Sequence, residues 1–335
     1  MTSFVESILI LFTVIVAIAT ILPLFHVTHY AVRGWDFPRL QIASVAGILL
    51  IFSIYFAEFN APLFWGLIIA LALCLMHQLW WILPYTALWR TEVKSTDESS
   101  EEYVLSLITA NVLMTNEKSD RLIEIVKKYK PDMLVTLETN EWWEEKLSVL
   151  EAEMPHTVKY PLENLYGMHL YSRIPLYDTE VKFLVEKDVP SIHTCVRLND
   201  QIAVRMHFLH PAPPSPTENE ESKERDAELV IVAKSVSKSD QPVVVTGDLN
   251  DVAWSRTTRL FRKLSGMFDP RVGRGMFNTF HADYFLLRWP LDHIFISSHF
   301  RLCHIKRLPS IGSDHFPLYT MIAYRREDQT DDNGL

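Results

Sequence analysis

Three long apolar runs in the first ninety residues constrain the fold of this 335-residue chain more than any other feature. They cover about residues 5–25, 40–58 and 61–83, and few polar side chains interrupt them. A helix needs roughly 20 mostly apolar residues to cross the hydrocarbon core of a bilayer. We therefore predict that residues 1–90 form a bundle of three transmembrane helices. Burial of all three helices in a soluble core is disfavoured, because they would crowd into the first quarter of the chain.

Basic residues next to the runs predict how this bundle is oriented. Arg33 and Arg39 lie between the first two runs, and Arg90 and Lys94 follow the third. With three spans, all four fall on one side of the membrane, and the Lys/Arg bias assigns that side to the cytoplasm. The prediction is thus a multi-pass protein with a cytoplasmic domain. Three spans and only three cysteines fit a bacterial inner membrane.

The rest of the chain divides by composition. Residues 91–102 form a polar, acidic linker, residues 103–325 a soluble domain, and residues 326–335 a polar tail that we expect to be disordered. The charges of residues 1–94 cancel, so the net charge of −9 belongs to the part that follows. An acidic domain is a poor non-specific binder of nucleic acid, since such binding needs Lys and Arg at the phosphates. The sequence assigns no oligomeric state.

One stretch of the soluble domain combines a buried strand with polar residues at its end. Val243–Val245 are three β-branched residues in a row, which predicts a buried strand, and Gly247 ends it. Asp248 and Asn250 follow two residues apart, and in extended geometry both side chains lie on one face. A carboxylate and an amide there can hold a water, a metal ion or a phosphate oxygen. A simple turn explains the same residues equally well.

Other predicted strands also end in polar residues. Helical spacing predicts helices at about 121–129, 227–235 and 255–264, and repeated short strands between 166 and 209 predict antiparallel pairing. The polar residues that end or follow strands are Asn111, Glu138, His210, Asp248, Asn250, Asp292, Asp314 and His315. Arg271–Phe280 reads as a loop that runs into a further strand. A carboxylate at a strand end is costly to bury unpaired, so Glu138 is either exposed or bound to a partner.

Three motifs among these strand-end residues carry a resemblance to a known family. They are Thr246-Gly247-Asp248-Leu249-Asn250, Leu291-Asp292-His293 and Gly312-Ser313-Asp314-His315, with Pro131-Asp132 and Glu138 upstream. Together they resemble the endonuclease/exonuclease/phosphatase superfamily, the fold of DNase I, over about residues 103–325. The resemblance implies an α+β, four-layer α/β/β/α sandwich of two mostly antiparallel sheets, with the active site at one edge.

The resemblance also implies a chemistry, in which water attacks phosphorus in line and a cation meets the charge on the phosphoryl oxygens. It implies roles for eight residues: Glu138, Asn111 and Asp314 as Mg²⁺ ligands, with Mn²⁺ as a substitute; Asp248 and Asn250 as groups that orient or deprotonate the water; His315, paired with Asp292, as base or cationic phosphate contact; and His210 as donor to the developing charge. The family often has an acidic residue where this chain has Leu113, so a second metal is not expected. We expect His169, His281 and His293 to be structural.

Three functions compete for such a chain. The first is a membrane-anchored, Mg²⁺-dependent phosphoesterase that acts on a lipid-linked or headgroup phosphate, favoured because tethering raises the local concentration at the bilayer. The second is a nuclease, disfavoured by the acidic balance, although Arg256, Arg259 and Arg262 could form a local basic stripe. The third is a non-catalytic membrane scaffold, disfavoured because an idle site would keep costly buried charges.

Overall fold

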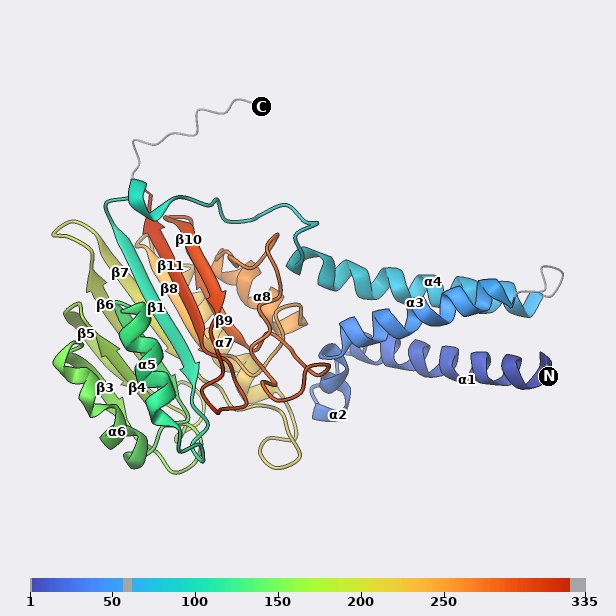
Figure 1. Ribbon diagram of the computed structural model, residues 1–335, viewed down its shortest axis with the longest axis horizontal. Helices are drawn as coiled ribbons and strands as arrows, with labels where there is room; N and C mark the ends of the chain where they lie inside the picture. Colours follow the sequence, from blue (N-terminus) through green and yellow to red (C-terminus); the bar gives the residue numbers. More distant parts are fainter. Residues whose placement is uncertain (1, 57–61, 326–335) are drawn as a thin grey trace.

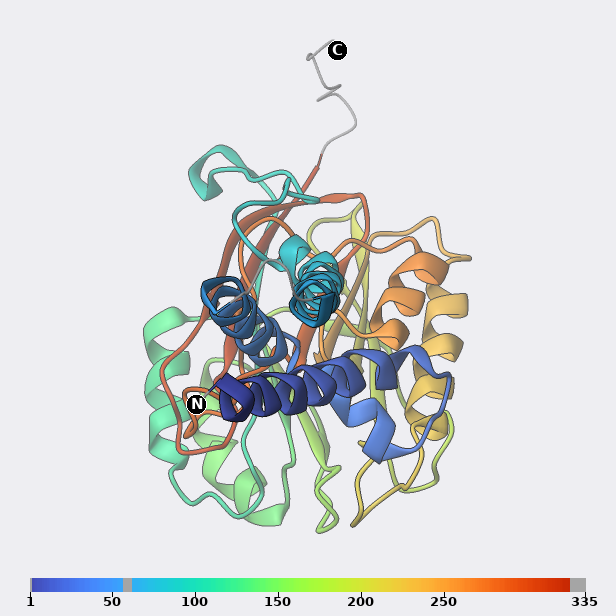
Figure 2. The same ribbon diagram turned by 90° about the vertical axis from the view of Figure 1, so that its right-hand side faces the viewer.

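The computed structural model describes residues 2–56 and 62–325. The polar break that separates the second and third runs and the tail predicted to be disordered lie outside the described residues. A group of long helices projects from one side of a domain built around two β-sheets (Figures 1 and 2).

The projecting helices are long and apolar. They are α1 (Thr2–Ile21), α3 (Arg39–Tyr55) and α4 (Pro62–Ile82), with the short α2 (Tyr30–Arg33) before α3. Phe4–Leu24 and Pro62–Tyr85 are each long and apolar enough to cross a membrane, and α3 qualifies only together with Tyr30–Asp36, from which it is bent by 67°. The described residues therefore hold two candidate spans, or three if the bent pair counts as one. Many of their large apolar side chains are exposed, such as Ile51 at 69% and Ile69 at 56%.

The first sheet has six strands in the order β10-β11-β1-β2-β4-β3. Its strands are β1 (Val104–Asn111), β2 (Met133–Leu137), β3 (His156–Tyr160), β4 (Met168–Ser172), β10 (Phe300–Arg307) and β11 (Leu318–Tyr324). Helices α5 (Ser119–Tyr129) and α6 (Glu141–Leu147) cover its outer face. Leu122 and Val126 of α5 and Trp143 of α6 are buried there, because their apolar sides face the sheet.

The second sheet has five strands in the order β5-β6-β7-β8-β9. Its strands are β5 (Leu176–Lys182), β6 (Ser191–Arg197), β7 (Ala203–Leu209), β8 (Val243–Asp248) and β9 (Asp292–Ile296). Helices α7 (Lys223–Val236) and α8 (Arg256–Ser265) pack on its outer face through Leu229, Val232 and Phe261. Short 3-10 helices complete the described elements: η1 (Leu22–Leu24), η2 (Gly34–Asp36), η3 (Leu83–Tyr85), η4 (Glu98–Ser100) and η5 (Ser148–Ala152).

The inner faces of the two sheets share one apolar core. Leu107 and Val135 of the first sheet and Phe208, Val244 and Ile294 of the second are all buried in it. Alternate residues of each strand face this core, as the two-residue period of a strand requires. The expected α+β sandwich of four layers, α/β/β/α, is confirmed.

The topology brings four strand ends to one rim. β1 runs parallel to β2, and β7 runs parallel to β8, so the carboxyl ends of each pair lie at one edge of its sheet. The hydroxyls of Thr109 in β1 and Thr246 in β8 lie 2.8 Å apart and join the two sheets near this edge. Residues that follow β1, β2, β7 and β8 therefore meet at the same rim.

Buried polar contacts join the projecting helices to this rim. Nη2 of Arg33 lies 3.3 Å from Oδ2 of Asp251, just after β8. Arg39 contacts Asp36 at 2.5 Å, and the indole of Trp254 donates to the backbone oxygen of Asp36 at 2.8 Å. The hydroxyl of Tyr85 donates to the Ala253 oxygen at 2.7 Å. The helices thus dock directly behind the loop that follows β8.

Some predictions need correction. Among the described residues, 271–280 contain no strand; Phe280 forms only isolated bridges, to Trp289 and His315. Strands β3 and β10 were not predicted, because both carry charged or half-buried residues that mask the alternation. The orientation argument treated Arg33 and Arg39 as free loop charges, yet both are buried in ion pairs, so the argument depends on Arg90 and Lys94.

Candidate active site

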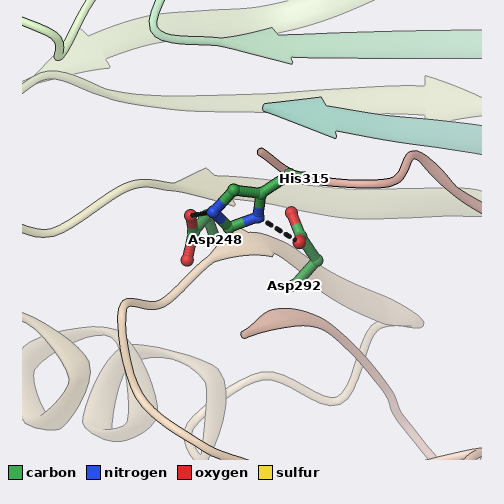
Figure 3. A group of neighbouring side chains, drawn as sticks. All are labelled: Asp248, Asp292 and His315. Atoms are coloured by element: carbon green, nitrogen blue, oxygen red, sulfur yellow. Dashed lines mark hydrogen bonds and ion pairs between the residues drawn. The ribbon is translucent and has the colours of Figure 1, made fainter. Parts of the chain in front are cut away.

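The rim holds a buried chain of carboxylate, imidazole and carboxylate (Figure 3). Nδ1 of His315 lies 2.8 Å from Oδ2 of Asp292, and its Nε2 lies 3.4 Å from Oδ2 of Asp248. Asp248 ends β8, Asp292 begins the adjacent strand β9, and His315 precedes β11 of the other sheet. All three are at most 4% exposed. The imidazole therefore bridges the two sheets between two buried acids.

This arrangement determines the charge of each member. Burial alone would lower the pKa of His315, but attraction to Asp292 and Asp248 outweighs it and raises that pKa to about 10. Burial would raise the pKa of Asp292, yet the adjacent imidazolium holds it below its usual range. Burial raises the pKa of Asp248 to about 7 despite the same neighbour. At neutral pH the site thus holds a protonated imidazole paired with an ionised Asp292.

Glu138 and Asn111 lie beside this trio. The amide nitrogen of Asn111, at the end of β1, donates to Oε1 of Glu138 at 2.6 Å and to Oδ2 of Asp248 at 3.2 Å. Glu138 follows β2 with a φ of 59°, which turns the backbone sharply at the strand end. Burial raises the pKa of its carboxyl to about 7. The amide of Asn111 therefore joins Glu138 to Asp248.

Asn250 lies at the rim, but in a turn rather than in the extended conformation that placed it on one face with Asp248. β8 ends at Asp248, and the backbone nitrogen of Asn250 donates to Oδ1 of Asp248 at 2.9 Å. Asn250 itself has a φ of 50°, so this is a tight turn of the kind Asp and Asn favour, and the extended geometry was wrong. Its side-chain amide donates to the Pro211 oxygen at 3.0 Å. That bond ties Asn250 to the loop that carries His210.

His210 follows β7, and its Nε2 lies 4.0 Å from Oδ2 of Asp248. It is 2% exposed, and its ring lies 5.5 Å from the ring of Tyr166. Burial, with repulsion from His315, lowers its pKa to about 3. A neutral imidazole can donate one N–H, so the residue can serve as a hydrogen-bond donor at neutral pH.

Asp314 lies at the open side of the group. It is half-buried, its Oδ1 accepts from the Ser313 hydroxyl at 3.3 Å, and its negative charge acts on both Glu138 and His315. The structure thus brings all eight predicted site residues to one rim of the sandwich. The hydrogen bonds of Asn250 go to Asp248 and Pro211, and that of Asp314 goes to Ser313, rather than to the imidazole.

The three histidines expected to be structural are His169, His281 and His293. His169 is fully buried in β4, on the face of the sheet opposite the core. His293 accepts from Arg271 through Nδ1 at 2.7 Å, so its Nε2 carries the proton and donates to the Asp251 oxygen at 2.9 Å. His281 accepts from the Asp283 nitrogen at 3.2 Å.

Sequence reasoning missed two supports of the trio. The hydroxyl of Thr279 accepts from the Asp292 nitrogen at 3.2 Å, and the ring of Phe280 lies 4.9 Å from that of His315. Both residues belong to the segment that was taken to enter a strand. Their only signal in the sequence is an aromatic residue next to a small hydroxyl residue, which is too common to identify a site.

The residues fit a hard divalent cation. Glu138 is a half-buried carboxylate with no lysine or arginine among its contacts in the described structure, and Oδ1 of Asp292 is buried without a hydrogen-bond partner. Carboxylate and amide oxygens are the ligands that Mg²⁺ and Mn²⁺ prefer. Asp248, Asp292 and His315 also lie close enough together to hold an ion, within 4.8 Å. Because both ring nitrogens of His315 already face carboxylates, Glu138 and Asn111 are the better ligands.

Known proteins resemble this chain in family and in fold. A family model described as the endonuclease/exonuclease/phosphatase family matches residues 108–315. No curated protein matches the chain.

Several solved structures share the fold. D. rerio TDP2 with a single-strand DNA product is 15% identical, with a TM-score of 0.54 and coverage of 65% of this chain and 98% of that one. The catalytic domain of human nocturnin with bound sulfate is 15% identical, with a TM-score of 0.55 and coverage of 70% and 98%. A Beutenbergia cavernae protein named for the same family is 16% identical, with a TM-score of 0.53 and coverage of 66% and 72%.

At such identities these structures support the fold alone, while the family model covers more than half of the chain. The chain therefore belongs to the endonuclease/exonuclease/phosphatase family, whose members are divalent-metal-dependent hydrolases of phosphoric ester bonds.

Proposed function

We propose that this chain is a membrane-anchored, Mg²⁺-dependent phosphoesterase that acts on a lipid-linked or headgroup phosphate. The observation that carries the proposal is the position of the Asp248–His315–Asp292 group at the rim where the candidate spans dock. A substrate held in the membrane would meet the site without leaving the surface, since tethering keeps enzyme and substrate at high effective concentration.

Glu138 and Asn111, with Asp314 at the open side, would hold Mg²⁺ or, as a substitute, Mn²⁺. When bound, the cation supplies positive charge against the phosphoryl oxygens as the phosphorus is attacked. The amide of Asn111, whose Nδ2 faces Glu138 and whose Oδ1 accepts from the Leu113 nitrogen at 3.1 Å, would have to rotate and give up that bond to present its oxygen to the ion.

The remaining residues would carry the proton chemistry. Asp248, whose pKa of about 7 leaves it partly ionised at neutral pH, would orient and deprotonate the attacking water, with Asn250 beside it. His315, held protonated by Asp292, would contact the phosphate as a cation. The neutral His210 would donate a hydrogen bond to the developing charge.

The test is a substrate panel on the purified full chain in lipid nanodiscs. Phospholipid phosphates, soluble nucleotides and plasmid DNA would each be assayed with Mg²⁺ and with chelator. We expect hydrolysis of the lipid phosphates only with the metal, and its loss in Glu138→Gln. The matched control is Glu124→Gln, which changes an exposed glutamate on α5 and should keep full activity. Lipid phosphates left intact under all conditions would refute the proposal.

The panel also separates the two alternatives. The neighbour with a DNA product raises the nuclease alternative, but the predicted basic stripe does not lead to the site: Arg262 pairs with Glu92 at 2.5 Å, and Arg259 lies over Trp81. Plasmid left uncut at excess enzyme would exclude a nuclease. Any hydrolysis that Glu138→Gln abolishes would exclude a non-catalytic scaffold. Reporter fusions after each helix would test the bacterial inner-membrane location and cytoplasmic side.

A further inference from the structure

An exposed apolar loop lies between α8 and β9. Its residues 284–287 are Tyr284, Phe285, Leu286 and Leu287, which are 59%, 78%, 75% and 47% exposed. Four consecutive large apolar side chains in water are unfavourable, so a surface of this kind marks a contact with another apolar phase. The loop is held in one shape, because the Leu287 nitrogen donates to the Tyr284 oxygen at 3.1 Å and the His281 nitrogen to the Leu287 oxygen at 3.1 Å.

This loop touches the first turn of a candidate span. The side-chain amide of Gln41 in α3 donates to the Leu286 oxygen at 2.6 Å. Beyond Gln41, the exposed side of α3 is apolar, with Val45 at 42%, Ile48 at 54% and Ile51 at 69%. The exposed loop and the outer face of α3 are therefore neighbouring parts of one apolar surface. In Figure 1 the helices leave the domain on the side where this orange-red loop lies.

The same loop is attached to the active site. At its start, the Ala282 nitrogen donates to the Asp314 oxygen at 2.6 Å, and Phe280 packs on His315. Only three residues separate Phe280 from the first exposed aromatic, Tyr284. A surface that contacts residues 284–287 therefore lies close to Asp314 and His315.

A cation lies between the loop and the site. The guanidinium of Arg288 lies over the ring of Phe285 at 5.3 Å and over that of Phe316, next to His315, at 5.0 Å. The guanidinium of Arg307 also lies over the Phe316 ring, at 4.5 Å. Arginines stacked on aromatic rings at the edge of an apolar surface are suited to phosphate groups at the headgroup level of a bilayer.

We propose that residues 284–287 insert into the same membrane surface that α3 enters, and that Arg288 meets the phosphate of an amphiphile in that surface. The active site thereby takes its phosphate esters laterally from the bilayer. The occupant is a lipid leaflet because the loop continues the apolar face of α3. The insertion of the loop does not depend on the proposed function, whereas the lateral supply of substrate rests on the proposed function.

The insertion is tested without any measurement of activity. The full chain, with Cys74, Cys195 and Cys303 replaced by alanine, would carry Phe285→Cys labelled with a polarity-sensitive fluorophore, in nanodiscs of phospholipid with and without doxyl-labelled lipid. The matched control is Val149→Cys, because Val149 is 51% exposed on η5, directly after α6, which lies on the side of the sandwich away from the projecting helices in Figure 1. We expect a blue shift and quenching at 285 and neither at 149. A label at 285 that behaves like the one at 149 would overturn the proposal.

A second variant guards against a label that distorts the loop. Leu286→Cys should give the same quenching, and a blue shift without doxyl quenching at both positions would indicate a protein contact and refute insertion.

The lateral supply is tested with two substrates. For Phe285→Ser with Leu286→Ser, the ratio of hydrolysis of a phospholipid in vesicles to hydrolysis of a soluble aryl phosphodiester should fall about tenfold. Val149→Ser should leave the ratio unchanged. An unchanged ratio in the loop variant would refute lateral supply. If the unmodified chain hydrolyses neither substrate, the proposed function fails, whereas the quenching result still decides the insertion.

Discussion

Replacement of Gly247 by alanine tests how closely the strand ends must approach at the rim. Gly247 pairs with Leu209 between parallel strands β7 and β8, with a φ of 148°. A Cβ at this position would lie 1.9 Å from the Leu209 backbone oxygen, whereas real Cβ contacts essentially never fall under 3.0 Å. The strands must then separate by about 1 Å, and backbone cannot yield as a flexible side chain does.

Two costs follow from this separation. Overpacking and the unfavourable φ together should destabilise the domain by about 4 kcal/mol. For a domain of this size the melting temperature should fall by about 10 °C. His210 and Asp248 directly follow the two separated strand positions, so their geometry changes as well. A shift of about 1 Å at a catalytic group can cost about a hundredfold in rate.

The assay compares Gly247→Ala with Gly266→Ala, both measured by thermal unfolding in nanodiscs and by hydrolysis of the best substrate. Gly266 follows α8 with a φ of 71° and has open space around it, so only the backbone cost of about 1 kcal/mol applies. We expect the control to lose about 3 °C and to keep its activity. If Gly247→Ala melts with the control and stays active, the argument that this close approach positions the site is wrong.

Three further results are expected. Because the pKa of Glu138 is raised to about 7, protons compete with the cation below that pH, so Mg²⁺ should raise the melting temperature more at pH 8 than at pH 6. Without metal, the folded state holds the Glu138 proton more tightly than the unfolded state does, so the protein should lose stability as pH rises from about 4.5 to 7. Asp292→Asn removes the main charge that raises the pKa of His315, so the alkaline limb of the pH–rate profile should move from about pH 10 toward neutrality; an unmoved limb would contradict this pairing. Arg33→Ala removes one of the two arginines that face each of the buried carboxylates Asp36 and Asp251 and should cost about 2 kcal/mol in chemical unfolding, whereas the exposed Arg90→Ala should change stability by less than about 0.5 kcal/mol.

Strand ends were the part of the site that sequence could predict. A run such as Val243–Val245 can only be a buried element, and a polar residue at its end must sit at the edge of a sheet. That reasoning located Asn111, Glu138 and Asp248 correctly at the ends of β1, β2 and β8, whereas Asp292, which was predicted to end or follow a strand, begins β9. That these ends meet at one rim was implied by the family resemblance, because it depends on which strands pair in parallel.

Local conformation and loop contacts were not predictable in the same way. The φ of Glu138 goes with its hydrogen bond to Asn111, which forms only when β1 and β2 pair. The turn at Asn250 combines a local bond to Asp248 with a side-chain bond to the Pro211 oxygen in the loop after β7. Strand β10 alternates core residues such as Leu302 with charged ones, but without its partner β11 this pattern resembles that of a surface loop. In each case a distant partner determines what the local sequence leaves open.

The docking of the helices shows most clearly that contacts with residues distant in sequence could not be predicted. Arg33 counts as a loop charge in sequence, yet in the structure it binds Asp251, more than two hundred residues away and three positions after Asp248. The carboxylate of Asp251 also accepts from Ser255, which caps α8, and meets Arg225 of α7. A single arginine before a candidate span thus contributes to the turn that positions Asp248. The helical segment is therefore part of the wall behind the active site, because its removal would leave that turn with one cation fewer.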